Sequence, residues 1–130
     1  MSNNPFKDFP VISSYTRQEA IDDGTLINIT DITKQRGFKF PVCITSRLYA
    51  CLESIPKKYS LETVRGRIND ILDMLIFKIQ ISKEKASDII YFQVIIHDSR
   101  NSKTPKRLYS RCSAGDNMEP VITIMFEDED

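Results

Sequence analysis

The sequence predicts a single α+β domain in which an antiparallel sheet packs against one long central helix. Residues 60–80 carry apolar side chains at helical spacing along their whole length, and short N-terminal helices precede them. Residues 89–96, 107–112 and 121–126 are β-rich and joined by turn-forming residues, which predicts a C-terminal three-stranded meander. The 130 residues are enough for one core, and no stretch rich in Pro, Gly or Ser divides them.

The central helix is the element around which we expect the domain to be built. Ser60 is a favoured N-cap residue, and Glu62 places a carboxylate near the positive end of the helix dipole. Met74, Ile76 and Phe77 widen the apolar stripe near the C-terminal end, so this helix needs cover on more than one side. The stripe itself consists of Val64, Ile68, Ile71, Leu72, Leu75 and Ile79.

The chain begins with a polar arm, residues 1–14, and a short helix. Thr16 and Glu19 fit a capping box, which predicts a helix through Asp23 that Gly24 ends. We expect the arm to pack along the domain because it carries four apolar side chains: Phe6, Phe9, Val11 and Ile12.

Two extended segments and a helical turn follow. Residues 25–30 alternate as a strand, and Asp31 is expected to cap a single turn that Gly37 closes. Residues 38–45 form a second extended segment. Because Pro41 cannot donate a hydrogen bond to a ladder, this segment is predicted to be an edge strand or an irregular approach to one.

The remaining elements are a third helix and the strands. Thr45 or Ser46 caps a short helix that stops before Pro56. Residues 89–96 have one fully apolar face and one partly apolar face, which predicts a central strand, covered well on one side and partly on the other.

Composition argues against two broad classes of protein. The chain has 18 basic and 18 acidic residues, so bulk charge does not predict a coat for nucleic acid or membrane. No apolar run approaches the ~20 residues of a membrane span, and the first 14 residues lack a signal-peptide pattern. Cys43, Cys51 and Cys112 show no C-x-x-C spacing, so we expect buried thiols. We expect a cytoplasmic protein.

Two oppositely charged segments supply the candidate binding residues. The basic segment suits a phosphate or an acidic protein face, and the acidic tail, residues 127–130, suits imitation of nucleic-acid phosphates. Alternatively, both are solvated edges that protect a strand from aggregation. The basic residues are Arg100, Lys103, Lys106, Arg107 and Arg111. The acidic residues are Asp116, Glu119, Glu127, Asp128, Glu129 and Asp130.

Catalytic patterns are weak in this sequence. His97 precedes a carboxylate, as a general base often does, and Tyr109 and Cys112 are expected on the neighbouring strand. The alternative is a strand-end histidine that packs into a turn. Glu127 and Glu129 with His97 faintly resemble an ADP-ribosyl transfer site, but acids in the last residues are expected to fray. The glycines are isolated, and there is one histidine, so we expect no enzyme, no cofactor and no metal site.

Three stretches resemble a family of small proteins carried on plasmids, integrative elements and phages and known only as a domain of unknown function. They are residues 11–30 (VISSYTRQEAIDDGTLINIT), residues 37–45 (GFKFPVCIT) followed by Gly66, Arg67 and residues 70–75, and residues 114–130 (AGDNMEPVITIMFEDED). They span most of the chain in the family's order. The central helix departs from the family, because residues 68–69 and 71–73 stand where the family tends to show tryptophans.

The resemblance implies an accessory protein of a mobile element, and such proteins often act against host defence by binding CRISPR or restriction machinery. We therefore expect a non-enzymatic inhibitor that binds a host protein or ribonucleoprotein complex through the basic segment and the acidic tail. Two alternatives stay open: a small enzyme that uses His97, and a nucleic-acid-associated binding module. Direct binding to nucleic acid is possible but less favoured, and we expect no membrane partner.

Overall fold

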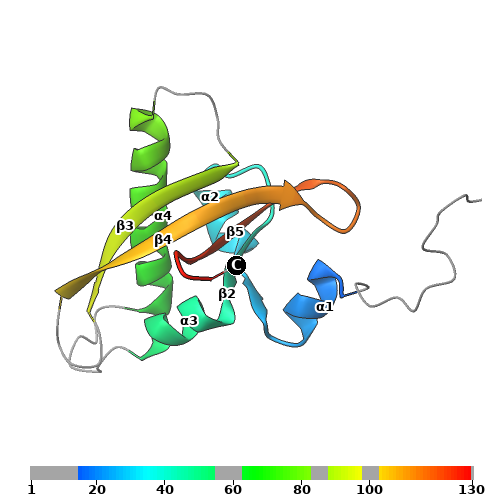
Figure 1. Ribbon diagram of the computed structural model, residues 1–130, viewed down its shortest axis with the longest axis horizontal. Coiled ribbons are helices and arrows are strands. Elements are labelled where there is room, and N and C mark those ends of the chain that lie inside the picture. Colours follow the sequence, from blue (N-terminus) through cyan, green and yellow to red (C-terminus); the bar gives the residue numbers. More distant parts are fainter. Residues whose placement is uncertain (1–14, 55–62, 83–87, 98–102, 130) are drawn as a thin grey trace, which may run out of the picture.

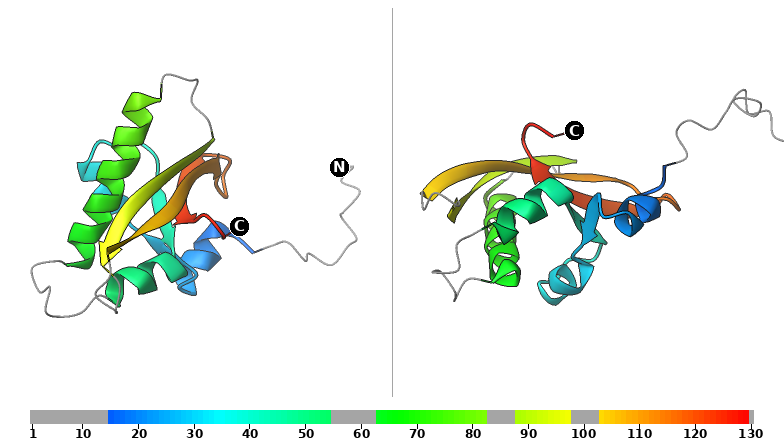
Figure 2. Two further views of the ribbon diagram at one scale, coloured as in Figure 1. Left: turned by 60° about the vertical axis from the view of Figure 1, so that its left-hand side comes forward. Right: turned by 90° about the horizontal axis from the view of Figure 1, so that it is seen from below.

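The computed structural model describes residues 15–54, 63–82, 88–97 and 103–129 (Figure 1). The elements are α1 (Arg17–Asp22), β1 (Leu26–Asn28), α2 (Thr30–Gln35), β2 (Val42–Thr45), α3 (Ser46–Glu53), α4 (Val64–Ile81), β3 (Ile89–His97), β4 (Lys103–Ala114) and β5 (Pro120–Phe126). The strands form one sheet in the order β1-β2-β5-β4-β3. The right view of Figure 2 shows α2, α3 and α4 on one face of this sheet. The α+β class is confirmed.

The sheet is mixed, so the expectation of an antiparallel sheet is wrong. β3, β4 and β5 are antiparallel neighbours, and β1 is antiparallel to β2. β2 and β5, however, run parallel, with Val42 opposite Ile122 and Ile44 opposite Ile124. The parallel pair arises because the chain leaves β2 through two helices and a β-hairpin before β5 enters beside it in the same direction.

Two strands occupy different positions from those predicted. β2 is an interior strand, and Val42, Cys43 and Ile44 are almost completely buried. Pro41 does not force an edge position, because it precedes the strand and its carbonyl accepts a hydrogen bond from the Ile122 N–H at 2.9 Å. β3 was expected to be a central strand, but it is an edge strand of the sheet.

Local signals placed the short helices well. The Thr16 hydroxyl accepts a hydrogen bond from the Glu19 N–H at 3.0 Å and caps α1, and Gly24 follows with a positive φ of 85°. Thr45 caps α3, through a bond from the Leu48 N–H.

Two predicted caps are not the observed ones. The N-cap of α2 is Ile29, so Asp31 lies inside the first turn. The N-cap of α4 is Thr63, whose hydroxyl accepts from the Gly66 N–H at 3.0 Å. Ser60 and Glu62 lie outside the described residues, as does the arm 1–14.

The core lies between α4 and the sheet. The buried stripe of α4 packs mainly on β3, and α3 closes the core near the N-terminal end of α4. Ile68, Ile71, Leu72 and Leu75 supply the helix side of this core. Phe92, Val94, Ile96, Leu108 and Ile124 supply the sheet side, and Leu48 and Leu52 come from α3.

Substitution at the centre of this core tests the fold. Leu72 is fully buried, so Leu72→Asp would place an unpaired charge between α4 and the sheet. We expect the domain to unfold or to lose several kcal/mol of unfolding free energy, measured by urea denaturation. Met118→Asp is the matched control, because Met118 is 80% exposed. A Leu72→Asp protein as stable as this control would contradict the core assignment.

Candidate functional site

One face of the β3–β4 hairpin carries exposed side chains that the helices do not cover. In β-strands successive side chains alternate between faces, so Phe92 and Val94 point toward α4 and their neighbours point away. Tyr91 is 55% and Ile95 is 63% exposed. The register places Arg107 opposite Gln93, and both are exposed. We call this surface the open-face patch; it consists of Ile89, Tyr91, Gln93, Ile95, Pro105, Arg107 and Arg111.

The predicted basic segment is divided between the two faces of the sheet. Arg107 and Arg111 lie in the open-face patch, whereas Lys106 is half-buried on the face that bears α4. Lys103 is the first residue of β4 and pairs with His97 in the backbone register. The side chain of Lys103 and the whole of Arg100 lie outside the described residues. The pair Arg107 and Arg111 is therefore the basic group whose common face the structure defines.

An aromatic pair lies within the open-face patch, because Tyr109 is directly opposite Tyr91 on the same face of the sheet. The rings of Tyr91 and Tyr109 have their centroids 5.6 Å apart and are tilted by 40°. Tyr109 is only 7% exposed, and its hydroxyl donates to the Glu129 carbonyl at 2.6 Å. The buried ring is thus held at its hydroxyl end, and it offers a fixed contact for the exposed Tyr91.

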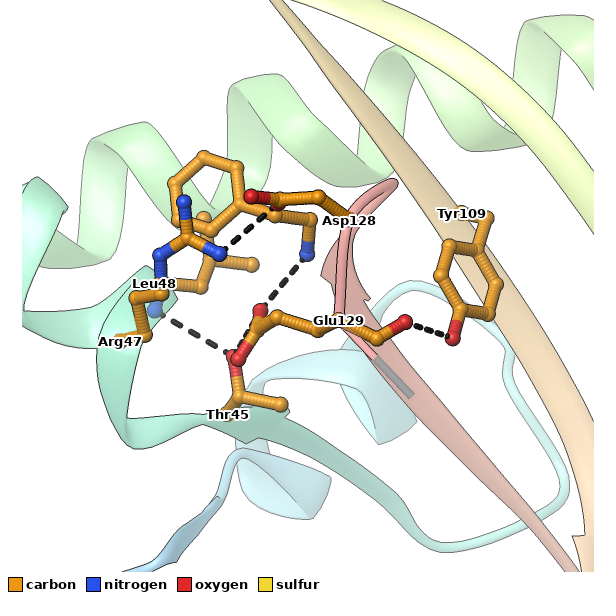
Figure 3. A network of polar contacts seen from close by, with 7 residues as sticks. Thr45, Arg47, Leu48, Tyr109, Asp128 and Glu129 are labelled. Atoms are coloured by element: carbon orange, nitrogen blue, oxygen red, sulfur yellow. Dashed lines mark hydrogen bonds and ion pairs between the residues drawn. The ribbon is translucent and has the colours of Figure 1, made fainter.

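The acidic tail is folded onto the domain, so the expectation that it frays is wrong for Asp128 and Glu129. The Glu129 carboxylate accepts hydrogen bonds from the Thr45 hydroxyl at 2.9 Å and from the Phe126 N–H at 2.8 Å (Figure 3). Arg47 donates to the Asp128 carboxylate at 2.8 Å. We call this network the tail clasp; it consists of Thr45, Arg47, Tyr109, Asp128 and Glu129.

Arg47 has two partners in the tail clasp. Its guanidinium lies 4.6 Å from the centre of the Phe126 ring and also forms the ion pair with Asp128. The hydrogen bond from Arg47 holds the pKa of Asp128 below its ordinary range. The ion pair therefore stabilises the fold above the ordinary pKa of an aspartate and is lost as the pH falls through the lowered one.

The four acids of the predicted site have different environments. Glu127 is exposed, and its N–H donates to the Arg107 carbonyl at 3.0 Å, next to the open-face patch. Asp128 and Glu129 are engaged by the tail clasp, and Asp130 lies outside the described residues. Sequence reasoning missed the tail clasp because Thr45 and Glu129 are 84 positions apart, and no local signal joins them.

Two stretches that carry the family resemblance contact each other. The Asp116 carboxylate accepts from the N–H groups of Arg17 and Gln18 at 2.8 and 3.0 Å. The Arg17 guanidinium donates to the Thr123 hydroxyl at 2.7 Å and the Ile122 carbonyl at 2.8 Å. These contacts hold α1 against β5, so Arg17 and Asp116 stabilise the fold.

The groups of the enzyme alternative do not share one face. Tyr109 and Cys112 project from opposite faces of β4, because their positions differ by an odd number. The Tyr109 hydroxyl is also engaged by the Glu129 carbonyl. The His97 side chain lies outside the described part of the structure.

The described ranges hold neither a metal-binding cluster nor a membrane-spanning helix. There, His, Cys, Asp and Glu side chains form no group of three that would hold a metal ion. Over the same ranges, every helix is too short or too polar to span a bilayer. Cys43, Cys51 and Cys112 are thiols that form no disulfide; Cys43 is buried as expected, whereas Cys51 and Cys112 are only half-buried.

The tail clasp can be tested by removing one carboxylate. Glu129→Ala leaves the Thr45 hydroxyl and the Phe126 N–H without this acceptor. We expect a loss of about 1–3 kcal/mol in unfolding free energy, measured by urea denaturation. The matched control is Glu127→Ala, which alters an exposed acid two positions away and should stay within about 0.5 kcal/mol of wild type. Equal effects of the two variants would contradict the tail clasp.

Comparison with known proteins supplies the family of this chain. No curated protein and no solved structure matches it. The family match extends over residues 1–130 and so includes α1, the open-face patch and the tail clasp. The chain therefore belongs to the family of unknown function DUF6573.

Proposed function

We propose that this protein is a non-enzymatic accessory protein of a mobile element that binds and inhibits a host macromolecular complex. The family resemblance supports the mobile-element setting, and a defence complex such as CRISPR or restriction machinery is the target class that fits it. The observation that carries the proposal is the open-face patch, where exposed Tyr91 and Ile95 lie beside Arg107 and Arg111. Binding without catalysis is the function that this surface supports best.

The composition of the open-face patch favours a macromolecular partner. Tyrosine and arginine are enriched among the residues that dominate binding energy at protein interfaces. Complete burial of an apolar side chain such as Ile95 contributes about 1.5–3 kcal/mol. Tyr91 and Ile95 lie on one strand, with Arg107 between them on the next strand, so one flat partner can contact all three.

The charge of the surface favours an acidic partner. Arg107 and Arg111 are both exposed on this face, and their guanidinium groups suit carboxylates or phosphates with bidentate geometry. The acidic tail is a weaker candidate for the contact, because Asp128 and Glu129 would have to leave the tail clasp before a basic partner received them. The proposed binding surface is therefore the open-face patch with Arg107 and Arg111, and not the acidic tail.

A nucleic-acid-associated module is the second candidate function. Exposed aromatic and arginine side chains on an open sheet face are typical of single-stranded nucleic-acid platforms, where bases stack on the rings. Tyr91, held against Tyr109 and flanked by Arg107, has this composition. Binding assays with each partner class separate the two candidates.

Charge reversal on the open-face patch tests the proposed function. Arg107→Glu with Arg111→Glu should leave the melting temperature within a few degrees of wild type, because both side chains are exposed. Capture of the host complex from lysate should weaken, and the remaining binding should lose its salt sensitivity, because rim charges act through attraction at a distance. The matched control is Lys34→Glu with Lys39→Glu, two exposed lysines outside the patch.

Two further measurements distinguish a protein partner from a nucleic-acid partner and test the rest of the basic segment. Loss of binding to fluorescently labelled single-stranded RNA, with unchanged capture of a protein complex, would favour the nucleic-acid candidate. The triple variant Arg100→Glu, Lys103→Glu and Lys106→Glu tests the rest of the basic segment. If both charge-reversal variants fold and retain full activity, the basic surface is not the binding site.

The enzyme alternative has its own test. We expect His97→Ala to leave the inhibitory activity unchanged, because a binding surface on the open-face patch does not need a general base at this position. General acid–base groups typically contribute ~100-fold or more to a reaction. A loss of activity of that size, in a His97→Ala variant with wild-type melting temperature, would contradict the binding proposal and support the enzyme alternative.

A further inference from the structure

The C-terminal end of α4 extends beyond the sheet that it covers. Both Figure 1 and the left view of Figure 2 show this end of the helix past the outer edge of β3. Ile79 follows Leu72 and Leu75 on the buried face of α4 at helical spacing, yet it is 44% exposed. Phe77 and Ile81 are also 55% and 53% exposed, but they lie on the opposite side of the helix from Leu75 and Ile79. The helix face that packs on the sheet therefore continues without cover where the sheet ends.

The outer edge of β3 has backbone groups available for another strand. The Cys112 N–H donates to the Asp88 carbonyl at 2.7 Å, and these two residues continue the β3–β4 register. Hydrogen-bonded pairs alternate along an antiparallel ladder, so Ile90, Phe92 and Val94 bond to β4. The N–H and C=O groups of Tyr91, Gln93 and Ile95 consequently point away from β4, and no described strand pairs with that edge.

This edge lacks the usual protection against pairing. Natural edge strands commonly carry lysine, proline or an inward-pointing charge that blocks further strands. Residues 89–96 contain none of these, and their sequence is IIYFQVII. Two hollows of about 430 and 440 Å³ lie between α4 and the β3–β4 hairpin. α4 residues such as Met74, Phe77 and Ile81 line one side of these hollows. β3 residues 91–95 line the other side, together with Pro105, Arg107 and Leu108 of β4 and with Glu127.

We propose that an extended peptide segment of a partner protein adds to the β3 edge as a sixth strand under the end of α4. A second copy of β3 does not fit this position with full overlap, because α4 already covers its own β3, where Phe92 and Val94 are 6% and 4% exposed. Paired strands lie about 4.8 Å apart, whereas packed helix axes need about 8–10 Å. The added strand must therefore come without a helix of its own.

The charges beside the two hollows define the chemistry of this peptide. Asp70 and Asp73 are exposed at the end near Ile95. Asp73 also forms an ion pair with Arg36, the C-cap residue of α2, and keeps 59% of its side chain exposed. Lys78 is exposed at the end near Tyr91. An antiparallel strand therefore fits with a basic residue at its N-terminal end and an acid at its C-terminal end. Apolar side chains at alternate positions between them would contact Ile79.

A designed peptide provides the probe. The fluorescently labelled nonapeptide KTITVTITE, at nanomolar concentration, should bind the full chain in an anisotropy titration. The matched control is ETITVTITK, in which the end charges are exchanged, and it should bind several-fold more weakly. Ile79→Asp should also weaken binding of the first peptide. Failure of KTITVTITE to bind at protein concentrations up to ~1 mM, the scale of very weak complexes, would overturn the proposal.

Proline at Gln93 tests strand addition in particular. The Gln93 N–H points away from β4, so Gln93→Pro removes a donor for the added strand and none from the β3–β4 ladder. We expect a folded protein with at least ~10-fold weaker peptide binding, whereas Gln93→Thr should bind as wild type. Unchanged binding by a folded Gln93→Pro protein would contradict the added strand.

Two controls keep the result decisive. If Gln93→Pro does not fold, two methylated forms of KTITVTITE replace this variant. One form carries a methyl group on the backbone nitrogen of each threonine, and the other carries it on the backbone nitrogen of each odd-numbered residue. Only one of the two forms should lose binding. If the free protein forms a dimer that Gln93→Pro dissolves, the occupant is a second copy and the partner-peptide proposal fails. The inference does not depend on the open-face patch, because Arg107→Glu with Arg111→Glu should leave peptide binding in place.

Discussion

The parallel pairing of β2 with β5 is the constraint on which the rest of the structure depends. It joins the N-terminal strands to the meander, and its residues are among the most deeply buried in the protein. Because β5 occupies the place beside β2, β4 and β3 extend the sheet outward, and β3 becomes its edge. α4 then covers one face of that edge, and the opposite face stays open. The open-face patch and the β3 edge are both consequences of this strand order.

The sequence was most informative where structure depends on neighbours in the chain. The Thr16 cap, the turns at Gly24 and Gly37 and the apolar stripe of α4 follow from spacings of three or four residues. Strand order was not predictable in this way, because the partner of β2 is nearly eighty residues away and its apolar run fits an edge or an interior position. The edge position predicted from Pro41 was wrong because β2 begins one residue after this proline.

The candidate site was predicted only in part, for the same physical reason. Consecutive basic residues on a strand point to opposite faces, so Lys106 is separated from Arg107 once β4 extends to Lys103. The role of the acids at 128 and 129 depends on Thr45 and Arg47, which only the folded chain brings near. Composition gave the correct charge at these positions, but it did not distinguish a free acid from one with a hydrogen-bonded partner.

The position of β5 also has a consequence for synthesis of the protein. β5 follows every other strand in the chain, yet it lies in the middle of the sheet, between β2 and β4. While residues 120–126 are still within the ribosome, β2 and β4 lack the strand that joins them, and both present open edges. Non-local pairing of this kind slows folding and exposes apolar surface meanwhile. The nascent chain therefore completes its sheet only after β5 has emerged, and until then its open strands are the ones that chaperones have to protect.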